Sequence, residues 1–233
     1  TEQNHEKVIL EVENYSVAFD RQIMEEVTFS MEAGEKVAIV GPNGTGKTTI
    51  LRDIYKNNNP AIKLDPDLKA AYLSQMHGEV FDEKATVLKN FEDAGFDTDD
   101  QVIAYLKTYG FEEELIYSPV CDLSGGEKNL LQLAKISRTG AGLLLLDEPT
   151  SHLDIYSQLA LEQAVEKYNG TVLMVSHDFY TVANCMDYVL FTEDKGLRKV
   201  SMRKFRKMIY ADHFDKDYLE LEQKKKEAEN RVA

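Results

Sequence analysis

The sequence contains no tryptophan, only two cysteines, and no apolar run of the ~18–20 residues that a membrane-spanning helix requires. Its longest apolar stretch covers residues 141–146, which is the length of a buried strand. Cys121 and Cys185 lack the spacing of a metal-binding or redox motif, and this fits a reducing compartment. The first residues contain no apolar signal-peptide core. These absences predict a cytoplasmic protein with no direct membrane insertion.

Acidic residues outnumber basic residues by 41 to 27, and the net charge is −14. Phosphate backbones bind to positive surfaces, so this balance argues against nucleic acid as a partner of the whole surface. A local exception is the basic run Arg198–Lys207, which has six basic residues in ten. Such a run either contacts RNA phosphates or forms the solvated face of a helix, and the sequence leaves both interpretations open.

Hydrophobic periodicity predicts an α/β fold. Alternation with a period of two predicts strands in the first forty residues, in an antiparallel β subdomain. Strands and helices alternate after residue 140, which predicts βαβ units and a mixed, largely parallel sheet core. The charged segment between these parts is interpreted as a helical subdomain, about residues 76–128, inserted in the core. The main domain is expected to cover residues 1–210, followed by a polar helical tail over 211–233.

Boundaries of the individual elements follow from the same patterns. Thr98 and Gln101 have the spacing of a capping box at the start of one expected helix. The expected strands cover residues 8–12, 27–31, 37–40, 71–74, 143–146, 171–175, 188–192 and 197–201, and the main expected helices cover 86–91, 98–109, 124–138 and 155–168.

A phosphate-binding loop is predicted between a buried strand and a helix. The segment Gly41-Pro42-Asn43-Gly44-Thr45-Gly46-Lys47-Thr48 matches the pattern G-x-x-x-x-G-K-[ST]. Its glycines allow consecutive backbone N–H groups to converge on phosphate oxygens at the start of a helix. In such a loop the lysine reaches the β- and γ-phosphates and the threonine hydroxyl ligates Mg²⁺.

Two carboxylates, Asp147 and Glu148, follow the apolar strand 143–146. A buried strand that ends in a carboxylate can deliver it to the Mg²⁺ ion beside a phosphate loop. Because successive side chains of a strand alternate, we expect Glu148 to face a different direction and to address the attacking water.

The segment Leu123-Ser124-Gly125-Gly126-Glu127 predicts both a helix start and a second phosphate-binding surface. Ser124 and Glu127 form the pattern of a capping box. The two glycines leave the backbone bare at the positive end of that helix, which suits phosphate. One nucleotide cannot easily use both this surface and the loop at Gly41, so we expect each to serve a different nucleotide.

These segments make the sequence similar to the ABC ATPase family over essentially its full length. The similarity rests on the loop GPNGTGKT, the signature LSGGE, the strand LLLLDEPT and Ser176-His177-Asp178. It implies a P-loop ABC ATPase that uses ATP and Mg²⁺, hydrolyses ATP to ADP and phosphate, and pairs head to tail with a second ABC ATPase domain. The signature of one domain then contacts the γ-phosphate held by the other.

The resemblance also implies roles for single residues. Glu148 is expected to be the general base, His177 the γ-phosphate sensor and Lys47 a catalytic cation. Gln75, Thr48 and Asp147 are the expected Mg²⁺ residues, and Asp154 fits the loop that crosses to the partner. Phe19 would stack on adenine, and Tyr15 is the weaker candidate for that role. The other expected nucleotide-binding residues are Gly41 to Thr48, Thr49, Ser124, Gly125 and Gly126.

Three biological interpretations compete for these motifs. The chain could be half of a soluble ABC-F protein that acts on the ribosome, the motor subunit of a membrane transporter, or a P-loop kinase. A kinase leaves LSGGE and His177 without a role. The segment Glu148-Pro-Thr-Ser-His-Leu-Asp154 resembles the ABC-F pattern EPTNHLD, and residues 109–126 resemble the second ABC-F domain. Phe179 and the acidic surface depart from that family. The sequence therefore favours an ABC-F role, with rRNA as a further partner, over a transporter motor.

Overall fold

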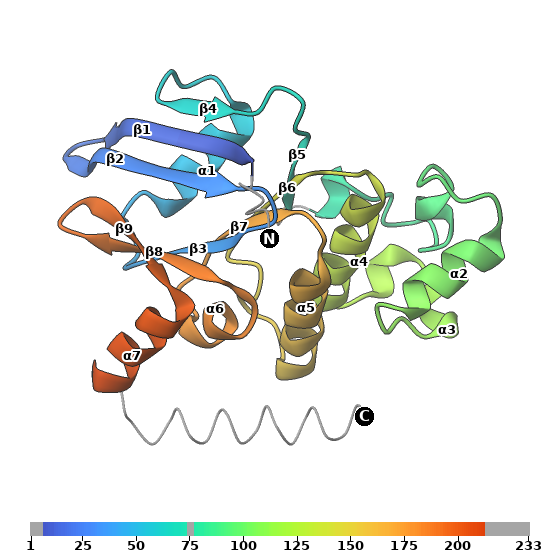
Figure 1. Ribbon diagram of the computed structural model, residues 1–233. Helices are drawn as coiled ribbons and strands as arrows, with labels where there is room; N and C mark the ends of the chain where they lie inside the picture. The colour runs from blue at the N-terminus through green and yellow to red at the C-terminus, as the bar shows by residue number, and fades with distance from the viewer. Residues whose placement is uncertain (1–6, 74–76, 213–233) are drawn as a thin grey trace, which may run out of the picture. The chain divides into compact units, whose positions relative to one another are not determined.

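The computed structural model describes residues 7–73 and 77–212 (Figure 1). Within these residues the chain divides into two compact units. The sheet unit contains the residues up to Tyr72, then Ala141–Pro149, and the residues from Asn169 onward. The helical unit contains Leu73–Gly140 and Thr150–Tyr168. None of the helices in the described ranges is both long and apolar enough to cross a membrane.

A three-stranded antiparallel sheet opens the sheet unit. Its strands β1 (Val8–Ala18), β2 (Gln22–Glu32) and β4 (Ile62–Leu64) lie in the order β2-β1-β4. Alternate residues face the core, and Leu10, Val12 and Met31 are completely buried. The period of two in the sequence therefore corresponds to one buried and one exposed face, and the predicted N-terminal strands are confirmed.

The second sheet has six strands in the order β5-β6-β7-β3-β8-β9. Strands β6, β7, β3 and β8 run parallel, and β9 returns antiparallel to β8 as the predicted hairpin. The central strands are apolar apart from one end residue each, because both faces of a parallel sheet are covered. The strands are β5 (Ala70–Leu73), β6 (Leu143–Asp147), β7 (Thr171–Val175), β3 (Lys36–Val40), β8 (Tyr188–Glu193) and β9 (Gly196–Ser201).

Parallel strands bring their carboxyl ends to one edge of the sheet. The residues that follow β3, β6 and β7 therefore lie at the same edge, where ligands bind in open α/β sheets. The helices of this unit are α1 (Lys47–Lys56), α6 (Phe179–Cys185) and α7 (Met202–Asp212). The fold thus gathers three sequence motifs, at residues 41–48, 147–148 and 176–178, that are separate in the chain.

The helical unit contains α2 (Asp99–Lys107), α3 (Glu113–Ile116), α4 (Gly125–Arg138) and α5 (Ile155–Lys167). The helices predicted over 98–109, 124–138 and 155–168 are confirmed. At the first of these only half of the expected capping box forms. Thr98 accepts from the Gln101 backbone N–H, whereas the Gln101 side chain accepts from the N–H of Asp97.

The helix predicted over residues 86–91 is wrong. Only a short 3₁₀ turn, Lys89–Phe91, forms there. The Asn90 side-chain amide donates to the carbonyls of Asp82 and Thr86 at 3.0 and 2.9 Å. The backbone before this turn, at residues 86–88, is paired with residues 116–119 and therefore does not wind into a helix. The predicted tail beyond residue 212 lies outside the described residues.

Candidate nucleotide-binding site

The phosphate loop begins where β3 leaves the sheet. Val40, the last residue of β3, pairs with Phe191 of β8, and α1 starts at Lys47. Gly44 and Gly46 have φ angles of 78° and 81°, a left-handed conformation that glycine adopts without strain. The Thr45 hydroxyl donates to the Pro42 carbonyl at 2.8 Å and holds the turn closed. The loop therefore has the conformation and position to present backbone N–H groups to an anion.

Lys47 is folded against its own loop. Its ammonium donates to the carbonyls of Gly41 and Pro42, both at 2.7 Å, and the residue is only 5% exposed. Burial lowers the pKa of Lys47, while the carboxylates of Glu148 and Asp147 act in the opposite direction. The cation is thus held next to two acidic groups at the carboxyl edge of the sheet.

Asp147 is the centre of a hydrogen-bonded group of oxygen atoms. Thr48 Oγ1 donates to one carboxylate oxygen of Asp147 at 3.1 Å, and the Tyr72 hydroxyl donates to the other at 3.0 Å. Burial and the neighbouring Asp147 raise the pKa of Tyr72 to about 12, so the phenol stays a donor at neutral pH. Hydroxyl and carboxylate oxygens are hard donors, and the pair Thr48–Asp147 fits Mg²⁺.

Glu148 and His177 form the second pair at this edge. Glu148 Oε2 lies 2.9 Å from His177 Nδ1 and accepts from the His177 backbone N–H at 3.3 Å. Strand β6 ends at Asp147, and Glu148 has a φ of 47°. Its separate direction therefore comes from a left-handed turn after the strand, and the explanation by strand alternation is wrong. The Glu148 backbone N–H donates to Val175 of β7 at 2.8 Å, which fixes this turn.

The predicted capping box at the signature segment is confirmed within the helical unit. Ser124 Oγ accepts from the Glu127 N–H at 3.1 Å, and Glu127 Oε1 accepts from the Ser124 N–H at 2.9 Å. A side chain at Gly125 would meet no atom within 4 Å, whereas one at Gly126 would overlap Ser157. Gly125 therefore leaves the helix start open, and Gly126 permits close packing of α4 on α5.

Asp154 has a structural role at the start of α5. Its carboxylate accepts from the backbone N–H groups of Tyr156 and Ser157, both at 3.0 Å. These hydrogen bonds, led by those from Ser157, hold the pKa of Asp154 below its usual value. The residue is an N-cap, as its position before an apolar run allows.

The aromatic candidates for adenine stacking differ in exposure. Phe19, in the turn between β1 and β2, is 70% exposed, so it is not a core aromatic. The weaker candidate, Tyr15, is wrong because it is completely buried and its hydroxyl donates to Asp53 at 2.7 Å. The expected Mg²⁺ residue Gln75 lies outside the described residues.

Sequence patterns missed two residues beside the motifs. Tyr72 lies on the short strand β5, and only the spatial order of the strands places its hydroxyl against Asp147. Thr192 follows Phe191 in β8 and faces Gly41, the first residue of the loop. A Cβ atom at Gly41 would lie 1.9 Å from Thr192 Oγ1. The first glycine of the loop is therefore required by its neighbour as well as by the phosphate.

A double substitution tests this close approach. Gly41→Ala is expected to lower the free energy of unfolding by about 2 kcal/mol, because the new methyl overlaps Thr192. Thr192→Gly removes every atom of the overlap, so the double variant should recover at least ~1 kcal/mol relative to the sum of the single effects. Urea unfolding of the four proteins measures the coupling. Strictly additive effects would show that Thr192 does not constrain Gly41.

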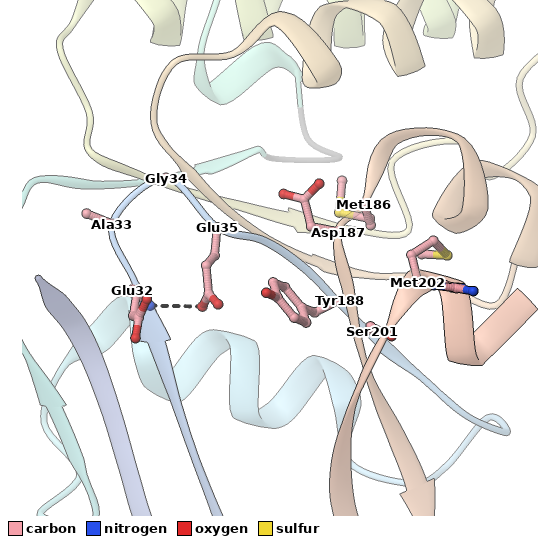
Figure 2. A pocket seen from close by; sticks show the side chains of 10 residues that line it. Glu32, Ala33, Gly34, Glu35, Met186, Asp187, Tyr188, Ser201 and Met202 are labelled. Carbon is pink, nitrogen blue, oxygen red and sulfur yellow. Dashed lines mark hydrogen bonds between the residues drawn. The ribbon is translucent and has the colours of Figure 1, made fainter. Parts of the chain in front are cut away.

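The sheet unit has a hollow at the amino ends of the parallel strands, opposite the edge that carries the phosphate loop. It has a volume of about 550 Å³ and lies between the turn Glu32–Glu35, the start of β8 and the start of α7 (Figure 2). The backbone N–H of Glu32 donates to the Glu35 side chain at 2.9 Å within it (Figure 2). Because β3 and β8 begin here and end at the phosphate loop, this hollow is separate from the nucleotide site.

A buried strand, a glycine-rich loop and a helix, with two acidic groups at the same sheet edge, define the class of P-loop ATPases. The sequence profile of the ABC transporter family matches residues 24–151. The chain belongs to this family and is an ABC ATPase domain, which binds and hydrolyses ATP. Solved structures share its fold: cbiO1 from Clostridium perfringens, part of an ABC transporter complex, has a TM-score of 0.70 at 20% identity and covers 89% of this chain and 96% of that one.

Curated relatives resemble the chain more closely in sequence. ABC transporter F family member 5 from Arabidopsis thaliana is 38% identical over 80% of this chain and 28% of its own length. The ribosome protection protein VmlR from Bacillus subtilis is 35% identical over 83% of this chain and 36% of its own. The energy-dependent translational throttle protein EttA from Escherichia coli is 34% identical over 81% and 35%. The chain thus spans about a third of the length of these relatives.

Proposed function

We propose that this chain is one nucleotide-binding domain of an ABC-F protein that acts on the ribosome and closes head to tail with a second ABC domain around ATP. The observation that carries the ATPase chemistry is the placement of Lys47, Asp147 and Glu148 at one sheet edge. The ABC-F role is supported by the relatives named above and by the segment Glu148–Asp154.

Binding of the triphosphate uses the loop Gly41–Thr49. Its N–H groups and the start of α1 attract the phosphates, and Lys47 exchanges the carbonyls of Gly41 and Pro42 for phosphate oxygens. Thr48 and Asp147 would hold Mg²⁺, which neutralises phosphate charge when bound. Tyr72 keeps the Asp147 carboxylate oriented through its hydrogen bond. Phe19, which is exposed in the turn between β1 and β2, would stack on the adenine.

Hydrolysis depends on Glu148. Its carboxylate accepts a proton from the water that attacks the γ-phosphate in line. His177 Nδ1 lies 2.9 Å from Oε2 of the same carboxylate, and the exposed His177 ring would contact the γ-phosphate. Lys47 stabilises the negative charge of the transferred group. Glu148 is thus the proposed acceptor of the water proton, and Lys47 is the proposed cation for the γ-phosphate.

The second domain completes the site. The open backbone at Gly125 and the hydroxyl of Ser124 would contact the γ-phosphate held by the partner, with Gly126 keeping the helix start in place. ATP then acts as an adhesive between the domains, and hydrolysis releases them.

Co-sedimentation with ribosomes tests the biological role. The full-length protein with Glu148→Gln should pellet with ribosomes in ATP and stay in the supernatant without nucleotide, because the closed pair persists. A Lys47→Ala version, used at an ATP concentration below its weakened Kd, serves as the control that leaves the site empty. If ATP produces dimers that do not pellet in any salt concentration, the ABC-F role is contradicted and the transporter-motor alternative takes its place.

A further inference from the structure

Helix α7 presents a cationic face to solvent. At about 100° per residue, its four basic side chains occupy an arc opposite Phe205, which is 1% exposed and packs against Phe179 at 5.8 Å between ring centroids. The four basic residues are all exposed and are Arg203, Lys204, Arg206 and Lys207. The buried side of α7 is therefore used in packing, and its charges face outward.

The structure separates the basic run of residues 198–207 into two groups. Arg198 pairs with Glu193 at 3.7 Å, Lys199 binds Glu35 at 2.9 Å, and Arg206 donates to the carbonyl of Ala183. These three cations have partners inside the sheet unit. Within residues 7–73 and 77–212, no ion pair involves the other three, which we call the α7 basic face and which are Arg203, Lys204 and Lys207.

The charges of this face do not favour the helix that carries them. The first turn of α7 has no acidic residue and contains Arg203 and Lys204, although the positive end of a helix dipole prefers anions there. Arg203 and Lys207 are also four residues apart, where like charges repel. The stability of α7 therefore does not explain its cations.

We propose that the α7 basic face binds the phosphate backbone of RNA, and this inference rests on the proposed ribosome function. The whole chain has a net charge of −14, so phosphates are repelled from most of its surface and attracted to this face. A bilayer is the less suitable partner because the apolar side of α7 is already buried around Phe205. The contact is electrostatic, between cationic side chains and phosphate groups, and is not specific for base sequence.

A charge-removal experiment tests the assignment on the full-length protein with Glu148→Gln and ATP. The variant Arg203→Gln/Lys204→Gln/Lys207→Gln is compared with Lys69→Gln/Lys84→Gln/Lys89→Gln, which removes the same charge at other exposed positions. Binding to ribosomes and to a short RNA duplex is measured across a salt series. The first variant should bind at least ~10-fold more weakly at low salt, with a log–log salt slope reduced by about 2–3. The control should change by less than about twofold.

Each further outcome decides between the two proposals. A charge-preserving variant, Arg203→Lys/Lys204→Arg/Lys207→Arg, should bind as the parent does, which separates charge from helix folding. If the Gln variant pellets with ribosomes at the parent's salt slope, the α7 assignment is overturned and the ribosome role stands. If the parent binds the duplex through α7 but does not pellet, the ribosome role fails and the RNA-binding face stands. Binding to phosphatidylserine vesicles in place of RNA overturns the face as an RNA site.

Discussion

Glu148→Gln is expected to reduce ATP turnover by at least ~100-fold while leaving ATP binding intact, because an amide of the same shape cannot accept the proton of the attacking water. The Glu148 side chain is a quarter exposed and contacts His177, and glutamine can keep this contact through its amide oxygen or nitrogen. Phosphate release measured at saturating ATP gives the rate, and size-exclusion chromatography in ATP should show a stable closed pair.

Two comparisons make this result specific. Glu11→Gln changes an exposed carboxylate in β1 and should turn over ATP at the unchanged rate. Adding Ser124→Arg to Glu148→Gln should keep nucleotide bound to a monomer, since a bulky cation at the signature blocks closure. Turnover by Glu148→Gln at the rate of the unchanged protein would refute the assignment of the base.

Lys47→Ala is expected to weaken ATP binding by about 3 kcal/mol, or roughly 100-fold in Kd. The expected loss is large because, in the proposed site, the ammonium would donate charge-assisted hydrogen bonds to two phosphates, which are stronger than bonds between neutral groups. Isothermal titration calorimetry with ATP and Mg²⁺ measures the change directly.

The matched control is Lys56→Ala at the exposed last turn of α1, which removes the same charge from the same helix. Its Kd should stay within about twofold of the parent value. Because Lys47 also binds the carbonyls of Gly41 and Pro42, its removal should lower the unfolding free energy by about 1–2 kcal/mol without unfolding the domain. An unchanged ATP affinity would show that Lys47 does not contact the phosphates.

The parallel core could be predicted because its signals are local. Residues 37–40, 143–146 and 172–175 are continuous apolar runs, and a motif residue follows each of them. The common edge then follows from parallel pairing alone. The helix expected over 86–91 failed because residues 86–88 pair with residues 116–119, and no local pattern in the segment signals a partner so far along the chain.

The contacts between motifs could not be predicted to the same degree. Tyr72 is one of twelve tyrosines, and its hydrogen bond to Asp147 depends on β5 lying beside β6. The clash that Thr192 imposes on Gly41 depends on the register of β3 and β8. Both contacts depend on which strands become neighbours in the assembled sheet, and the two strands of each pair lie far apart in the chain.

The left-handed backbone of Glu148 has a consequence for engineering this domain. A non-glycine residue at a φ of 47° is strained by about 1 kcal/mol, which glycine would relieve. A selection for heat resistance alone would therefore favour Glu148→Gly. The selected protein would be more stable but would lack the proposed general base for ATP hydrolysis. Thermal stability and the proposed activity oppose each other at this position, so a stabilised version of the domain must keep glutamate there despite the backbone strain.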